Sequence, residues 1–118
     1  MEAGHALTSP LGRITISSGV IAQIVGETAL ECYGVVGMKG SLRGRIARGK
    51  AHARGIEVGR DQDGAVTVDL HVVVAYGLNL AEVASSVRNR VAYEVERLTG
   101  LTVLAVEVHV DAVRTSGK

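Results

Sequence analysis

The pattern of apolar and polar residues predicts four strands. Apolar residues alternate with polar ones over residues 12–17, residues 66–74 and residues 104–111, which is the period of a strand with one covered face. A shorter alternation over residues 56–58 precedes the turn-forming residues 61–64, so the strands on either side of this turn are expected to form a β-hairpin. The apolar face predicted for the last strand consists of Leu104, Val106, Val108 and Val110.

Two helices are predicted where apolar residues recur at steps of three and four. The first covers residues 20–33, and the second lies between Asn79 and Gly100. A hydroxyl or side-chain amide oxygen can cap the free amides of a first helical turn, and glycine commonly ends a helix. The predicted caps are Ser17 or Ser18 for the first helix, which Gly34 ends, and Asn79 for the second. The predicted stripes are Ile21, Ile24, Val25, Thr28 and Cys32 on the first helix, and Leu80, Val83, Ala84, Val87, Val91, Val95 and Leu98 on the second.

These elements predict an α/β (α+β) fold in the order strand, helix, strand, strand, helix, strand. The helix between the last two strands favours a right-handed crossover, so those strands should be parallel and the small sheet mixed. Two helices on one face of this sheet make a two-layer sandwich. The other face would carry Thr67, Asp69, His71, Glu107, His109 and Asp111.

A chain of 118 residues suits a single domain. Residues 1–11 lack periodicity and contain the one proline, Pro10, so they are expected to be a flexible leader. The domain is assigned to residues 12–113, and residues 114–118 are expected to be a tail. With 47% hydrophobic residues, the chain can bury enough apolar surface to form one core.

Charge is distributed unevenly, although the formal net charge is only +1. Residues 37–55 are rich in glycine and arginine, which predicts a mobile basic loop with one helical turn near residues 42–47. The near-neutral total gives the whole domain no general attraction to nucleic acid or anionic lipid. Basic character therefore belongs to this segment, whose cations are Lys39, Arg43, Arg45, Arg48, Lys50 and Arg54.

Cysteine usage and hydropathy indicate a cytoplasmic protein. Cys32 is the single cysteine, so an intramolecular disulfide is excluded. The first residues lack the charged start and apolar run of a signal peptide. The longest apolar stretch, near residues 72–75, is far shorter than the about 20 residues that span a bilayer. We expect no direct membrane insertion, and any peripheral association with the membrane would depend on a partner.

Three segments resemble the bacterial alkaline-shock family of envelope-stress proteins. They are GVVGM at residues 34–38, the long strand that runs into Tyr76 and Gly77, and Thr99-Gly100-Leu101 before a valine-rich strand. The resemblance covers residues 12–113. It implies a cytoplasmic protein tied to cell-envelope stress, often held at the membrane by an anchored partner and prone to self-association. It implies no catalytic residue and no cofactor, and the basic loop departs from the family pattern.

An alternative interpretation is an RNA-binding module. A G-x-x-G turn after a helix offers backbone amides to phosphates, as in KH domains, and Gly37-Met38-Lys39-Gly40 follows the first predicted helix. Against this, Arg43 occupies a position where the second helix of a KH domain needs an apolar residue. The candidate contact residues are Gly37, Lys39, Gly40, Arg43 and Arg45.

Metal binding and catalysis are weaker hypotheses. Imidazoles and carboxylates share one face of two strands and are possible ligands for a divalent ion, but an exposed polar sheet face explains the same alternation. The weak metal candidates are Asp69, His71, His109 and Asp111, with Glu107 beside them. Cys32 lies on an apolar stripe and suits a small buried hydrophobe rather than a nucleophile. Nucleotide-binding loops and nucleophile elbows are also missing from the sequence, so a non-enzymatic protein is expected.

Self-association is expected through the outer sheet face. This face mixes small apolar residues with histidines, and most small oligomers are two-fold symmetric, so a dimer is the first expectation. Exposed sheet edges offer a second route to larger assemblies. Histidines at the contact would loosen it below about pH 6.5. The residues expected at the contact are Thr67, His71, Val73, Ala75, Ala105 and His109.

Overall fold

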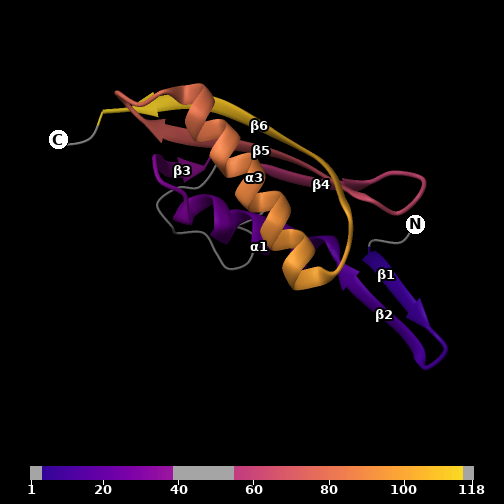
Figure 1. The fold of residues 1–118 in the computed structure, drawn as a ribbon. Helices are drawn as coiled ribbons and strands as arrows, with labels where there is room; N and C mark the ends of the chain where they lie inside the picture. The colour runs from indigo at the N-terminus through magenta and orange to yellow at the C-terminus, as the bar shows by residue number, and fades with distance from the viewer. Residues whose placement is uncertain (1–3, 39–54, 116–118) are drawn as a thin grey trace.

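A computed structural model describes residues 4–38 and 55–115 (Figure 1). Six strands and two long helices lie in these ranges. Their bounds are β1 Gly4–Ser9, β2 Gly12–Ser17, α1 Ser18–Glu31, β3 Val35–Met38, β4 Ile56–Arg60, β5 Val66–Ala75, α3 Leu80–Thr99 and β6 Val103–Arg114. Strands β1 and β2 form their own antiparallel pair, and the other strands form the main sheet.

Strand β5 is the centre of the main sheet. One of its edges pairs with β6 in parallel, as expected for strands joined by a helical crossover. Its other edge pairs antiparallel with β3 and β4, which follow one another end to end. Met38 is opposite Val72, and Ile56 is opposite Leu70. Strands β3 and β4 are therefore two halves of one interrupted edge strand.

Helices α1 and α3 cover one face of this sheet and make the second layer (Figure 1). Helix α3 lies against β6, whereas α1 packs on β3 and β4 and contacts α3. The strict alternation of β5 allows the helices to pack on the sheet, because every second side chain of the strand points at the helices and is buried. The largest fully buried side chains are Ile21, Val25, Val66, Leu70, Val72, Val74, Val87, Val91 and Val95.

Local side chains define the helix ends. The Ser17 hydroxyl accepts a hydrogen bond from the Val20 amide at 3.3 Å, which decides between the two predicted serine caps. The Asn79 side chain accepts one from the Glu82 amide at 3.0 Å, as predicted. Gly100 ends α3 with a φ of 77°, a left-handed conformation that favours glycine. The two-layer α+β fold, the mixed sheet and the placement of both helices on one face are confirmed.

The N-terminal residues differ from the predicted leader. The chain forms β1 and pairs it residue for residue with β2, from Gly4 opposite Ser17 to Ser9 opposite Gly12. Pro10 and Leu11 form the turn, where the fixed φ of proline suits the first central position. Because β2 pairs with β1 and not with the main sheet, Ile14 is 65% exposed rather than covered. Residues 4–9 thus form a strand because they pair with β2 across a tight turn, although their sequence has no strand-like periodicity.

The predicted loop at residues 37–55 begins later than expected. Residues 35–38 form β3, and Gly37 pairs with Val73 of β5. Val35 and Met38 are buried, so this strand closes the core beside α1. The physical reason is the free edge of β5, whose amides and carbonyls need partners. The helical turn predicted near residues 42–47 lies outside the described residues.

Three leucines predicted to be buried are partly exposed. Leu104 is 59% exposed because the β5–β6 register shifts between Val66 and Thr67, which makes an irregularity where Leu104 lies. Leu80 and Leu98 lie at the two ends of α3 and are 39% and 54% exposed. The buried stripe of α3 advances in four-residue steps instead. It consists of Val83, Val87, Val91, Val95 and Thr99.

Candidate functional site

Polar side chains gather on the sheet face that the helices leave open. The pairing register sets Glu57 of β4 beside Asp69 of β5, and Asp69 beside Glu107 of β6. Three carboxylates therefore form one row across three neighbouring strands, which lie about 4.8 Å apart. We call Glu57, Asp69 and Glu107 the carboxylate row.

Two imidazoles form the next row along the same strands. His71 is the register partner of His109, and their rings stack with centroids 4.4 Å apart and planes 14° apart. Nδ1 of His71 lies 3.0 Å from a carboxylate oxygen of Asp111. When Nδ1 carries a proton, its N–H group donates to this carboxylate. In the neutral form of that ring, Nε2 then has the free lone pair.

The two rows meet at His109. Its Nε2 atom lies 3.5 Å from Oδ1 of Asp69. One ligand atom each from Asp69, Glu107 and His109 lie within 4.8 Å of one another. Asp69 is half-buried, and the other two residues are exposed. Carboxylate oxygen and imidazole nitrogen are both ligands for divalent transition metals, so this arrangement can hold an ion after small side-chain rotations.

A β-bulge brings Asp111 into contact with His71. The register passes from Val72 opposite Val110 to Val73 opposite Ala112, so Asp111 is the extra residue of β6. Its carboxylate then reaches across to β5. One face thus carries all four weak metal candidates from the sequence, with His109 near Asp69 and with Asp111 reaching His71 through the bulge.

Glu57 is a member of the row that the alternation of β5 and β6 does not indicate. The hairpin register reveals it, because Arg60 pairs with Val66 across residues 61–65, and counting outward from this pair places Glu57 opposite Asp69. That count needs the register of the turn. Asp61 decides the register, since its carboxylate accepts hydrogen bonds from the amides of Asp63 and Ala65, each at 2.9 Å.

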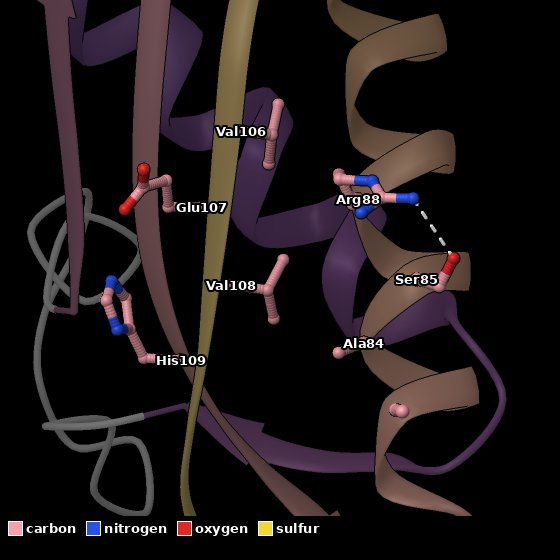
Figure 2. Close-up of a pocket in the computed structure, with 8 residues that line it drawn as sticks. Ala84, Ser85, Arg88, Val106, Glu107, Val108 and His109 are labelled. Atoms are coloured by element: carbon pink, nitrogen blue, oxygen red, sulfur yellow. Dashed lines mark hydrogen bonds between the residues drawn. The ribbon is translucent and has the colours of Figure 1, made fainter.

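A groove lies on the other side of β6, against α3 (Figure 2). Figure 2 shows Val106 and Val108 directed toward α3, whereas Glu107 and His109 point away from it. The helix contributes small residues, and Arg88 donates to the Ser85 hydroxyl at 3.2 Å. The groove measures about 440 Å³. Its lining residues are Ala81, Ala84, Ser85, Arg88, Val106, Glu107, Val108 and His109.

The groove adjoins a long sheet edge. In the described ranges, no strand pairs with the second edge of β6. Strand β6 spans 12 residues, Val103–Arg114, and its Val103 amide donates to a Glu96 carboxylate oxygen at 2.8 Å. Beyond that contact, this edge has no strand partner within the described ranges and can accept one. Sequence reasoning missed this groove, because small residues at Ala81, Ala84 and Ser85 indicate close packing as readily as an open surface.

Cys32 lies in the core. Its side chain is 8% exposed, and the thiol donates to the Thr28 carbonyl at 3.4 Å. Burial raises the pKa of the thiol above its ordinary value, and Glu31 adds to this effect while Arg90 opposes it. The interpretation of Cys32 as a small buried hydrophobe is confirmed.

The candidate RNA-binding loop has a different structural setting from a KH domain. Gly37 lies within β3 and pairs with β5, so it is part of a strand rather than a loop between two helices. Lys39, Gly40, Arg43 and Arg45 lie outside the described residues. The strand placement of Gly37 leaves the G-x-x-G comparison without structural support.

The fold and the polar outer face define a small two-layer α+β protein with titratable side chains gathered on an open sheet face. The chain belongs to the alkaline-shock protein 23 family, a family with a cell envelope-related function, whose sequence model matches residues 6–115. The resemblance to alkaline-shock proteins is thereby confirmed.

Relatives extend this match. The chain is 36% identical to the uncharacterized protein YloU of Bacillus subtilis over 115 residues, which are 93% of this chain and 95% of YloU. It is 34% identical to the uncharacterized protein Spy1614 of Streptococcus pyogenes over 91% of this chain and 92% of that protein. It is also 32% identical to a stress response regulator gls24 homolog of Streptococcus pyogenes, over 92% of this chain and 63% of the homolog. No solved structure matches the chain.

In residues 4–38 and 55–115, neither helix combines the length and apolar character needed to cross a bilayer. Helix α3 is long enough, but charged residues interrupt it throughout.

Proposed function

We propose that this protein is a non-enzymatic interaction module of the cell-envelope stress response, located in the cytoplasm and held near the membrane by an anchored partner. Membership of a cell envelope-related family supports the envelope part of this proposal. The observation that carries the interaction part is the edge of β6 beside the α3 groove, with which no strand pairs in the described ranges.

An extended segment of the partner suits this surface. Backbone groups along the edge of β6 can pair with an added strand, and pockets for alternate side chains then give specificity. Ala81, Ala84 and Ser85 are small, so they leave room beside β6 for such side chains. Arg88 places a cation at the groove, which favours a segment with an acidic residue.

The experiment is crosslinking in cells with a photoreactive residue at Ser85, followed by identification of the captured protein. Ala84→Arg fills the groove and should abolish capture of an envelope protein. Ser86→Arg adds the same side chain at an exposed position of α3 that does not line the groove, and it should leave capture intact. Equal capture by both variants, or recovery of RNA and ribosomes alone, would overturn the proposal.

Self-association is proposed through the same edge rather than through the outer face. Two copies packed by their outer faces would bring two carboxylate rows together, and like charges at close range repel. Two β6 edges can instead pair around a two-fold axis and extend both sheets. Light scattering of purified protein tests this: Ala84→Arg should reduce the oligomeric mass, and a constant mass would contradict the edge assignment.

A further inference from the structure

We propose that Asp69, Glu107 and His109 bind a divalent transition-metal ion, with Zn²⁺ as the representative ion, on the outer sheet face. Three protein ligands leave at least one coordination position for water or for a group of a partner. This site adjoins the proposed β6 docking edge, since Glu107 and His109 belong to β6 and border the groove, although their side chains point away from α3 (Figure 2).

The first argument is the cost of the carboxylate row in the absence of a cation. Like charges directly opposite one another on neighbouring strands are destabilising. Here the register places Asp69 between Glu57 on one side and Glu107 on the other. A bound cation converts this repulsion into attraction, since the same carboxylates that repel one another each attract the ion.

The second argument is the position of the imidazoles. His109 offers Nε2 at 3.5 Å from Asp69, in the same 4.8 Å group as the Glu107 carboxylate. The cluster therefore offers a nitrogen ligand as well as carboxylate oxygens. A nitrogen ligand favours zinc and other late transition metals over calcium and magnesium.

The third argument concerns the support of the His109 ring. His71 stacks on it, and Asp111 in turn holds His71 through a contact of 3.0 Å. A metal-bound imidazole needs a fixed ring orientation. Stacking on His71 restricts the orientation of the His109 ring. We therefore assign His71 as a positioning residue.

Among the residues that the structure describes, the other charged groups near the site do not neutralise it. Glu57 adds a further carboxylate beside Asp69, and Asp111 adds one beside His71. Arg114 belongs to the far end of the face, where its guanidinium donates to the Val36 carbonyl at 3.4 Å. The local field thus favours a cation.

The test is titration of Zn²⁺ into the full-length, untagged, metal-free protein, followed by calorimetry. Asp69→Asn, Glu107→Gln and His109→Gln should each weaken Zn²⁺ binding at least ten-fold, since a lost ligand costs no less than the 10–100-fold typical of a lost outer partner. Asp63→Asn makes the same kind of change at a carboxylate outside the cluster and should leave the affinity unchanged. Ca²⁺ should bind more weakly than Zn²⁺.

Thermal unfolding without metal supplies a second readout. Asp69→Asn removes the central charge of the row, so this variant should unfold at a higher temperature than the parent in the absence of metal and gain less from added Zn²⁺. Equal Zn²⁺ affinity in the parent and the three ligand variants, or tighter binding of Ca²⁺ than of Zn²⁺, would overturn the site. A lower unfolding temperature of metal-free Asp69→Asn would overturn the repulsion argument.

Discussion

The imidazole of His71 lies flat against that of His109, with a centroid separation of 4.4 Å and an angle of 14° between the planes. The parallel register of β5 and β6 produces this contact, because it sets the two residues directly side by side. The stack connects the Asp111 carboxylate on one side with the Asp69 carboxylate on the other.

The stack should contribute little to stability and more to ring orientation. We expect His71→Ala to lower the free energy of unfolding by less than about 1 kcal/mol, the scale of one cross-strand pair. The same change should weaken Zn²⁺ binding less than His109→Gln does. Urea denaturation and calorimetry measure the two effects. A His71→Ala variant with a Zn²⁺ affinity as low as that of His109→Gln would make His71 a ligand rather than a positioning residue.

Gly34 should tolerate an added side chain less well than Gly64 does. It has a φ of 92°, and an added Cβ would lie 2.9 Å from Leu78 Cδ1 and 3.1 Å from Val83 Cγ2. Gly64 has a similar φ of 88° with no atom within 4 Å of such a Cβ. Both Gly→Ala changes cost backbone strain of about 1–2 kcal/mol, and crowding adds about 1–3 kcal/mol at Gly34 alone. Chemical denaturation of both variants measures the difference, and equal losses would contradict the close approach.

The irregularity in β6 predicts opposite sensitivities for two apolar neighbours. Val106 is 8% exposed and Leu104 is 59% exposed. We expect Val106→Ala to lower the free energy of unfolding by about 1–2 kcal/mol, and Leu104→Ala by less than about 0.5 kcal/mol despite its larger side chain. Urea denaturation compares the two. A greater loss of unfolding free energy for Leu104→Ala would contradict the irregularity and support the unbroken alternation that the sequence predicted.

Glu94 should make stability depend on pH in the acidic range. Its hydrogen bond with Arg97, 2.7 Å long, lowers the pKa of the carboxyl, and the charges of Arg97 and Arg90 act in the same direction. Because the folded pKa lies below the unfolded value of about 4.3, the contribution is complete above the unfolded pKa and is lost as pH falls through the folded pKa.

Glu94→Gln should therefore flatten the fall of stability below about pH 4. Arg97→Gln removes the cationic partner of the same ion pair and should flatten the fall of stability similarly. Denaturation at a series of pH values measures the slopes. An unchanged slope in both variants would show that Glu94 is not coupled to folding.

Local patterns were sufficient for much of the fold. Asn79 and Gly100 bound α3 because capping and left-handed conformations depend on single residues and their immediate neighbours. The two-residue period of β5 placed His71 and Asp69 on the face away from the helices, because side chains alternate in any strand. The polar outer face was predictable for the same reason.

Long-range pairing decided the rest. The alignment of β3 and β4 along one edge of β5, the row formed by Glu57, Asp69 and Glu107, and the bulge that turns Asp111 toward His71 all depend on register between strands far apart in the chain. A shift of one residue sends every side chain of a strand to the opposite face, and no local propensity selects among such shifts. The sequence alone determined which residues have polar chemistry and which face they occupy, whereas the tertiary structure decided which of them touch, since burial of the common core selects the register.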